Sequence, residues 1–255
     1  MSTPNGRETS SKAEPAPAGA ADSGPMFDDR YERAWVPPSA SLACRRPPLK
    51  SRSSTRGTFV NPRTHREVVY ESTLERDLAY ILLAHRDVET MQEQPREVEY
   101  VDRDGVVRTH IPDFRVELRD RTRISIDVKP AIKVGSSGIE DTLDLIRSQS
   151  KGGFADCFVL RTGEHITRDR AADARLIHKA RRMRNEDHVR EVLAVASALI
   201  GSIRIDALLA ATRNGGYGLM AVVCLIGDGV LEHVGPGRIS HDSFVRPAPT
   251  ATRSH

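Results

Sequence analysis

The chain has few cysteines, few aromatic residues and no long apolar stretch. Its three cysteines, Cys44, Cys157 and Cys224, lie far apart in 255 residues. This count and spacing fit neither a disulfide framework nor a zinc site. No apolar run approaches the roughly 20 residues that span a membrane, and no apolar segment after Met1 marks a secretory signal. These absences predict a soluble protein of a reducing cytoplasm, with no membrane partner.

Charges of both signs are abundant. The 38 Lys and Arg residues exceed the 35 Asp and Glu residues by three, and the isoelectric point is about 8.9. This balance permits a nucleic-acid partner without requiring one. Aromatic residues make up only 5% of the chain, so its cores are expected to be modest and aliphatic. The length corresponds to one or two domains.

The first 50 residues differ in composition from the rest. Eight of the fifteen prolines fall here, among Ala, Ser and Gly. Such a segment buries too little apolar surface to offset the entropy lost on ordering. We therefore predict a disordered tail over 1–50, interrupted by the aromatic patch Phe27, Tyr31 and Trp35, and a second disordered tail over 248–255.

Residues 51–165 have the pattern of an α/β domain. Apolar residues at helical spacing follow Ser72, namely Leu74, Leu78, Ile81 and Leu82. Two strands, 96–101 and 106–111, flank an Asp-Gly turn that is typical of a hairpin. Further strands are predicted over 114–118, 124–128 and 157–160, and a helix over 139–148.

The densest chemical signal lies on the strands 114–118 and 124–128. Apolar residues alternate in both, which places Asp113, Asp127 and Lys129 on the faces opposite the core. A hairpin centred near Arg121 would set Asp113 across from Lys129, with Asp127 as a diagonal neighbour. Two carboxylates and an amine would then converge on one part of the sheet. The alternative interpretation is an exposed strand face with a surface ion pair.

This cluster suits metal-dependent phosphodiester hydrolysis. Mg²⁺ prefers carboxylate and carbonyl oxygens and retains several waters. Asp113, Asp127 and the carbonyl of Val128 would supply such oxygens. Lys129 would orient the attacking water or stabilise charge that develops on the phosphate.

Glu75 is a third carboxylate candidate with a competing structural interpretation. Ser72 and Glu75 match a capping box, in which Glu75 would bond the backbone N–H of Ser72. Glu71 lies one turn earlier and is a rival ligand. None of the nine histidines has metal-ligand spacing, so none is assigned a role.

Several short motifs, in order, resemble the N-terminal domain of TnsA-type transposition endonucleases. They are YESTLERD at 70–77, QP at 94–95, IPDF at 111–114 and IDVKP at 126–130, within about 60–135. That family has the restriction-endonuclease-like PD-(D/E)xK fold with an αβββαβ core. The resemblance therefore implies an α/β (α+β) nuclease domain over 51–165.

The resemblance also implies which residues act. Its catalytic positions fall on Glu75, Asp113, Asp127 and Lys129, and its metal ligands on the three carboxylates and the Val128 carbonyl. The third position can be Gln in the family, whereas this chain has Asp127. The implied cofactor is Mg²⁺, for which Mn²⁺ can substitute.

The implied activity is that of a DNA endonuclease subunit of a heteromeric transposase. It would hydrolyse phosphodiester bonds at the 5′ ends of a transposon during cut-and-paste transposition. The implied partners are double-stranded DNA at transposon ends, a DDE transposase of TnsB type that cuts and joins the 3′ ends, and an AAA+ regulator of TnsC type. The implied location is the bacterial cytoplasm, in association with the nucleoid.

The remainder of the chain is predicted as a basic linker helix over 166–190 and a small winged-helix-like domain over 191–247. The linker either follows a phosphate backbone or is a solvated helix face. The domain would contain helices over 192–199, 205–211 and 219–226 and strands over 229–234 and 238–245. It resembles the family's C-terminal domain in placement, and its few basic residues favour a protein partner over DNA.

Two other functions compete with this hypothesis. One is a free-standing nuclease of the same fold that serves restriction or DNA repair. The other is a nuclease-dead adaptor that binds DNA or a partner. The intact set of Glu75, Asp113, Asp127 and Lys129 argues against the adaptor.

Overall fold

A computed structural model describes residues 36–45, 55–213 and 218–249. Most of the two predicted tails lies outside these residues, and so does the aromatic patch Phe27, Tyr31 and Trp35. The chain divides into two units, Met1–Pro37 and Pro38–His255, and the structure describes almost none of the first. All described helices and strands lie in the second unit.

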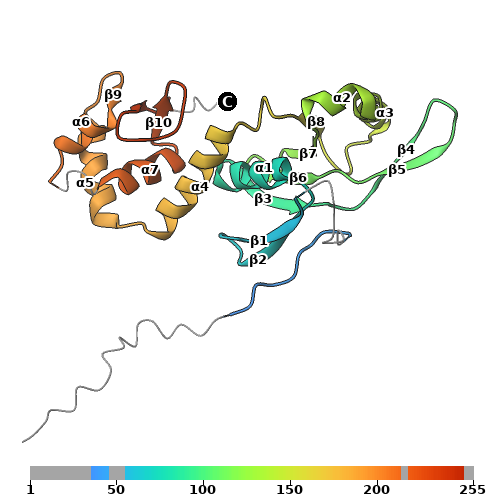
Figure 1. Cartoon of the computed structure of the whole chain (residues 1–255), viewed down its shortest axis with the longest axis horizontal. Helices are drawn as coiled ribbons and strands as arrows, with labels where there is room; N and C mark the ends of the chain where they lie inside the picture. The colour runs from blue at the N-terminus through green and yellow to red at the C-terminus, as the bar shows by residue number, and fades with distance from the viewer. Residues whose placement is uncertain (1–35, 46–54, 214–217, 250–255) are drawn as a thin grey trace, which may run out of the picture. The chain divides into compact units, whose positions relative to one another are not determined.

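A four-stranded mixed sheet forms the centre of the first half (Figure 1). Its strands stand in the order β3 (Val88–Glu93), β6 (Phe114–Leu118), β7 (Arg123–Val128) and β8 (Cys157–Arg161). β6 runs antiparallel to both of its neighbours, β3 and β7, and β8 is parallel to β7. A parallel pair needs a crossover connection, which here consists of α2 (Ala131–Ser137) and α3 (Ile139–Gln149).

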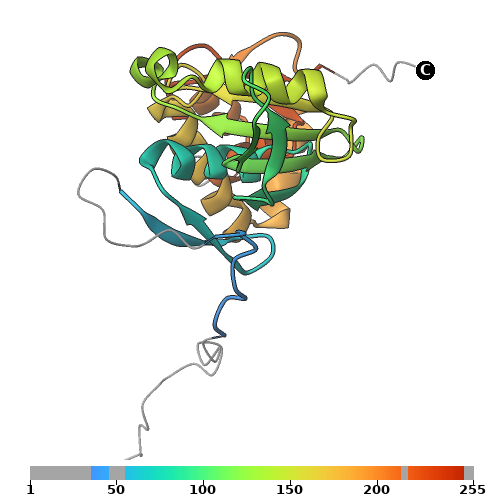
Figure 2. The same ribbon diagram turned by 90° about the vertical axis from the view of Figure 1, so that its right-hand side faces the viewer.

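Helices cover both faces of this sheet (Figure 2). On one face, Phe114, Val116 and Ile126 pack in one cluster with Leu78 and Leu83 of α1 (Thr73–Ala84). On the other face, Phe158 of β8 packs in a second cluster with the α3 side chains Leu143 and Ile146. The mixed α/β class expected from the sequence is thereby confirmed.

Three strands in the first half of the chain were not predicted, and neither was the short β9 (Ile203–Arg204). β1 (Gly57–Asn61) and β2 (Arg66–Tyr70) form an antiparallel hairpin, and β3 opens the main sheet. β3 lacks clean apolar alternation because its inward-facing Glu93, 1% exposed, is a carboxylate neutralised by Arg66 at 2.8 Å. A buried ion pair of this kind is invisible to a hydrophobicity pattern.

Part of the predicted tail is ordered against these strands. Ser39 pairs with Arg66 of β2, and the Cys44 N–H donates to the Gln94 carbonyl. The Ser41 hydroxyl donates to Glu93 at 2.6 Å. The assignment of 1–50 as a single disordered tail is therefore wrong for 39–44, because these backbone and side-chain bonds hold that segment in place.

The hairpin expected over 96–111 is present but stands apart from the main sheet. Its strands, β4 (Val98–Val101) and β5 (Val107–His110), pair only with each other among the described strands. The hairpin extends away from the main sheet in Figure 1. Gln149 at the end of α3 anchors it through two hydrogen bonds to the Val101 backbone, each 2.8 Å.

The predicted register between β6 and β7 was wrong. Phe114 pairs with Ile126 and Arg115 with Ser125, so the next step of the ladder sets Asp113 opposite Asp127 and not opposite Lys129. The turn is closed by the Leu118 N–H, which donates to the Thr122 carbonyl at 2.9 Å. Arg121 has a φ of 74°, typical of a three-residue hairpin loop with one left-handed residue.

The C-terminal region contains α4 (Arg168–Arg182), α5 (Glu186–Ala196), α6 (Ile205–Ala210) and α7 (Leu219–Gly227). Its strands β9 (Ile203–Arg204), β10 (Leu231–Val234) and β11 (Phe244–Pro247) form a sheet in the order β10-β11-β9. A separate apolar cluster holds these elements together. No helix in the described parts of the chain combines the length and apolar character needed to cross a bilayer.

Helix α4, predicted as a linker, packs against both α1 and α7. Its Ala171, Ala174 and Ala180 are buried, and Ala180 belongs to the C-terminal cluster. Arg175 pairs with Asp77 of α1 at 3.0 Å, so part of the basic stretch is used inside the fold. Neither predicted interpretation of that stretch anticipated this packing role.

Candidate functional site

The four predicted site residues lie on three elements. Glu75 lies in the first turn of α1, Asp113 directly precedes β6, Asp127 lies near the end of β7, and Lys129 directly follows β7. Burial raises the pKa of Asp113 well above its ordinary value, and the carboxylates of Glu75 and Asp127 raise it further. The structure thus brings three carboxylates into one electrostatic cluster.

Lys129 lies close enough to affect this cluster. Its ammonium group acts against the upward shift in pKa of both Asp113 and Glu75. The Lys129 N–H donates to the Arg161 carbonyl of β8 at 3.1 Å, which fixes the backbone where β7 ends. The predicted association of an amine with the carboxylates therefore holds, although the predicted register does not.

The side chain of Asp113 is fixed against β7. Its Oδ2 accepts a hydrogen bond of 2.7 Å from the Val128 N–H. The backbone carbonyl of Asp113 accepts from the Gln94 N–H at 2.8 Å. These contacts hold the half-buried carboxylate beside the end of β7, where the Val128 carbonyl also lies.

Glu75 is buried and caps α1. Its Oε2 accepts from the Glu71 N–H at 2.7 Å, and its Oε1 accepts from the Ser72 hydroxyl at 2.8 Å. Ser72 Oγ in turn accepts from the Glu75 N–H. The capping-box prediction paired the Glu75 carboxylate with the backbone N–H of Ser72. In the structure the carboxylate accepts from the backbone N–H of Glu71 instead. Burial is the main cause that raises the pKa of Glu75, and the Glu71 carboxylate adds to it.

Glu71, the rival ligand, is engaged elsewhere. Its Oε1 accepts a hydrogen bond of 2.8 Å from the Gln94 amide and lies 2.9 Å from the Arg45 guanidinium. Arg56 lies 3.8 Å from its other oxygen. Because the Glu75 carboxylate, and not that of Glu71, raises the pKa of Asp113, Glu75 is favoured as the member of the cluster.

The sequence analysis missed His110, the last residue of β5. Its Nε2 lies 2.8 Å from Asp127 Oδ1. Asp127 is only 2% exposed, and its Oδ2 is buried with no hydrogen-bond partner among the residues that the structure describes. The prediction of a solvated strand face was therefore wrong, because α3 packs over this face of the sheet and His110 contacts Asp127. The available signal was position, since β5 leads within three residues into Asp113.

The donor set fits a hard divalent cation. Within the described parts of the chain, no three His, Cys, Asp or Glu side chains form a ready-made metal-binding group. Mg²⁺ is usually held by one or two carboxylates, with waters and substrate phosphates in its other positions. A cation would stabilise the charged form of Asp113, which the neighbouring carboxylates destabilise. It would also stabilise Asp127, one of whose buried oxygens has no hydrogen-bond partner among the described residues.

Comparison with known proteins gives no independent assignment. No protein-family model matches the chain, and no curated protein matches it. The functional conclusion therefore depends on the geometry of the cluster and on the motifs that contain it.

Proposed function

We propose that this chain is a Mg²⁺-dependent DNA endonuclease subunit of a heteromeric transposase, which hydrolyses phosphodiester bonds at the 5′ ends of a transposon. The observation that carries the proposal is the electrostatic cluster of Glu75, Asp113 and Asp127 beside Lys129. The order α1, β3-β6-β7, α2-α3, β8 agrees with the αβββαβ core of restriction-endonuclease-like nucleases.

Each residue of the cluster has a role in this proposal. Asp113 and Asp127 would hold the cation with the Val128 carbonyl, and Glu75 would complete the negative charge around it. When bound there, the cation would supply polarisation of the phosphoryl group and a lowered pKa of a water ligand. Lys129 orients the attacking water and stabilises charge on the phosphate. His110 holds Asp127 in position through its 2.8 Å contact.

The C-terminal region supports a role in protein contact. The order α5-β9-α6-α7-β10-β11 and its three-stranded sheet support the winged-helix-like domain that we propose for this region. In such folds the third helix, here α7, is the one that enters a DNA groove. The residues from Ala221 to Leu225 in α7 are all buried, so this helix has little polar surface for reading bases.

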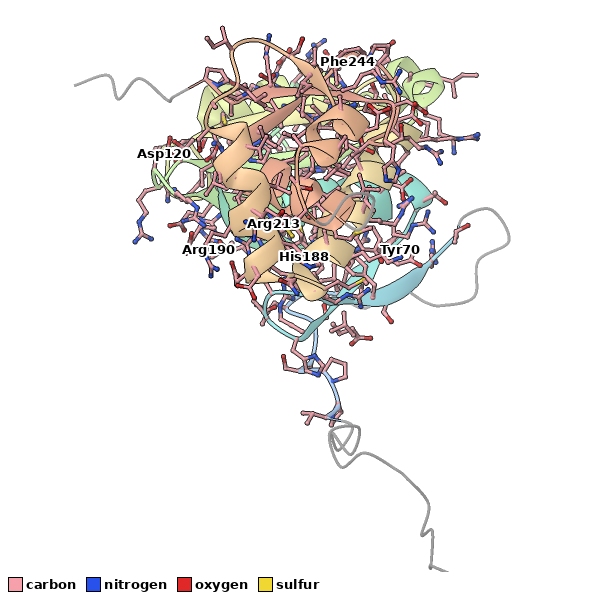
Figure 3. The ribbon with its side chains drawn as sticks, turned by 90° about the vertical axis from the view of Figure 1, so that its left-hand side faces the viewer. Tyr70, Asp120, His188, Arg190, Arg213 and Phe244 are labelled. Carbon is pink, nitrogen blue, oxygen red and sulfur yellow. The ribbon has the colours of Figure 1, made fainter. Side chains whose placement is uncertain are left out.

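The partners proposed for this region are the TnsC-type AAA+ regulator and the TnsB-type transposase. Two of its apolar side chains, Ile200 and Phe244, are exposed and available for such contact. Figure 3 shows the region from one side, with Phe244 and Arg213 labelled. Ile200→Glu and Phe244→Glu should reduce capture of the regulator while metal binding at the carboxylate cluster is retained.

A cleavage assay on end-labelled transposon DNA tests the function. The protein is assayed with and without the partner transposase, beside Asp113→Asn. Mg²⁺-dependent cuts at the 5′ ends that need the transposase and vanish in Asp113→Asn support the proposal. Efficient cleavage of unrelated duplexes without the transposase would favour a restriction or repair nuclease. No metal-dependent cleavage with the transposase present would favour the adaptor.

A further inference from the structure

We propose that a basic cleft at the end of α1 farthest from Glu75 binds a phosphate-bearing ligand. The cleft has a volume of about 730 Å³, within the range of ligand sites. Four arginines line it, together with Asp87, Glu89, Gly227 and Asp228. The arginines are Arg63, Arg86, Arg119 and Arg181.

Two of these arginines have an acidic residue nearby but no close ion pair in the described part of the chain. Among the described residues, neither Arg63 nor Arg181 forms an ion pair with a carboxylate. Burial lowers the pKa of the Arg63 guanidinium, and the charges of Arg181 and Arg119 lower it further. Two neighbouring cations that repel each other across a cleft are stabilised by an anion placed between them.

The acidic residues of the cleft neutralise it only in part. Arg86 lies 3.7 Å from Asp87, and Arg119 lies 3.9 Å from Glu89, both longer than a charge-assisted hydrogen bond. Asp228 is paired outside this group, at 2.7 Å from Arg184.

Backbone carbonyls hold the guanidinium groups in place. Arg63 donates to the carbonyls of Val88 and His85, at 2.6 and 3.0 Å. Arg181 donates to Ala84 and Gly227, at 2.9 and 2.8 Å. A guanidinium has five N–H donors, so each retains donors for a ligand after these bonds. Groups that are fixed before binding lose less entropy when a ligand arrives.

Two glycines of the C-terminal region make this arrangement possible. A Cβ on Gly229, whose φ is +72°, would collide with the Arg86 side chain. A Cβ on Gly227 would collide with Ile177 Cγ2 at 2.7 Å and would lie 3.4 Å from Arg181 Nη2. Arg86 donates to the Gly229 carbonyl at 2.9 Å, so the turn after α7 forms one wall of the cleft.

The cleft is separate from the carboxylate cluster. Asp113 precedes β6 and Arg119 follows its other end, so about 20 Å of extended strand separates the two positions. Phosphates held at the two places are therefore different groups. The ligand is either a second stretch of DNA backbone or a free phosphate compound such as a nucleotide.

Binding measurements in EDTA isolate the cleft from any metal-dependent chemistry. Isothermal titration uses the full-length protein with inorganic pyrophosphate in one arm and a short DNA duplex in the other. The variants are Arg63→Gln and Arg119→Gln. The matched control is Arg121→Gln, which lies two residues beyond Arg119, is 83% exposed and pairs with Glu117 outside the cleft. Thermal unfolding of each variant is recorded first.

We expect Arg63→Gln and Arg119→Gln to weaken binding about tenfold, equivalent to about 1.4 kcal/mol, and Arg121→Gln to leave it unchanged. If the variants lose affinity for the duplex, and the slope of log affinity against log salt concentration falls by about one, DNA is the ligand. A loss for pyrophosphate alone identifies a free phosphate compound. Arg119 is 67% exposed, so its variant folds even if Arg63→Gln does not. The proposal would be overturned if Arg119→Gln bound both probes as tightly as Arg121→Gln does. The arginines would then serve only to cap α1. Neither result bears on the nuclease assay.

Discussion

His110 Nε2 lies 2.8 Å from the Oδ1 atom of Asp127, and this contact joins the β4–β5 hairpin to the carboxylate cluster. Residues that orient metal ligands typically change metal affinity or activity by about 10–100-fold when they are replaced. His110 therefore acts as a positioning residue in the proposed site.

We expect His110→Phe, which fills a similar space without the hydrogen bond, to weaken Mn²⁺ binding by about 10–100-fold. His110→Gln, which keeps an N–H donor, should recover part of that loss. Electron paramagnetic resonance titration of Mn²⁺ measures both. Arg108→Gln is the matched control, because Arg108 is on the same strand but pairs with Asp102 at the hairpin turn. Equal affinity in the Phe variant and the control would reduce His110 to a packing role.

Asp113→Asn should stabilise the metal-free protein while it abolishes cleavage. Asn retains an acceptor for the Val128 N–H and removes the charge that Glu75 and Asp127 repel. A gain of about 1 kcal/mol would raise Tm by about 2–4 °C in a chain of this size. Thermal unfolding at neutral pH in EDTA measures the gain. A Tm below that of the wild type would show that the carboxylate serves stability and not a cation.

The same repulsion between Asp113 and its neighbouring carboxylates predicts that the stability of the metal-free protein depends on pH. Because the folded-state pKa of Asp113 is raised, the folded protein binds its proton more tightly than the unfolded chain does. Stability in EDTA should therefore fall as the pH rises from about 4, the ordinary value for Asp, through the raised pKa. Saturating Mg²⁺ should remove this decline in the wild type. Unfolding curves for wild type and Asp113→Asn are recorded across this pH range. If the free energy of unfolding changed equally with pH in both proteins, this prediction would be wrong.

Glu75→Gln separates charge from capping. Gln can accept from the Glu71 N–H and donate to Ser72, so α1 should keep its cap and the protein its Tm within about 2 °C. Cleavage should fall at least about 100-fold. Glu71→Gln is the control, since Glu71 is engaged by Gln94 and Arg45. Full activity in Glu75→Gln with loss in Glu71→Gln would exchange the two assignments.

His178 should make the packing of α4 on α1 sensitive to acid. Burial lowers the pKa of His178 to about 4, and its neutral ring donates from Nε2 to the Tyr80 carbonyl at 3.1 Å. The stability it contributes is complete above about pH 6.5 and is lost as the pH falls towards 4, by roughly 3 kcal/mol. Urea unfolding of His178→Gln should show a weaker pH dependence than that of the exposed control His241→Gln. Parallel curves for the two variants would contradict this assignment.

The sequence was sufficient for elements with regular apolar alternation. β6, β7, α6 and α7 appear close to their predicted ranges, because their burial follows hydrophobicity. The helix predicted over 192–199 was misplaced, since α5 begins at Glu186 and ends at Ala196. Strand β3 was missed because its buried face includes Glu93, whose burial depends on Arg66 from another strand. A pairing between distant residues leaves no local pattern.

The site shows the same limit. The spacing around Asp113 and Asp127 identified both carboxylates, but their relation depended on the loop conformation at Arg121, which shifts the register. The burial of Asp127 depends on His110, which reaches it from a separate hairpin. Motif and alternation therefore indicate candidate site residues, whereas three-dimensional pairing decides which of them are exposed and how they are held.

The most direct test of the central claim is anomalous diffraction from crystals of the wild-type protein soaked in Mn²⁺, which stands for Mg²⁺. The account predicts an anomalous peak in contact with the carboxylates of Asp113 and Asp127, beside the Val128 carbonyl, and its loss in crystals of Asp113→Asn. Mn²⁺ bound only elsewhere in the wild type, or an unchanged peak in Asp113→Asn, would contradict the proposed metal site and the nuclease function that depends on it.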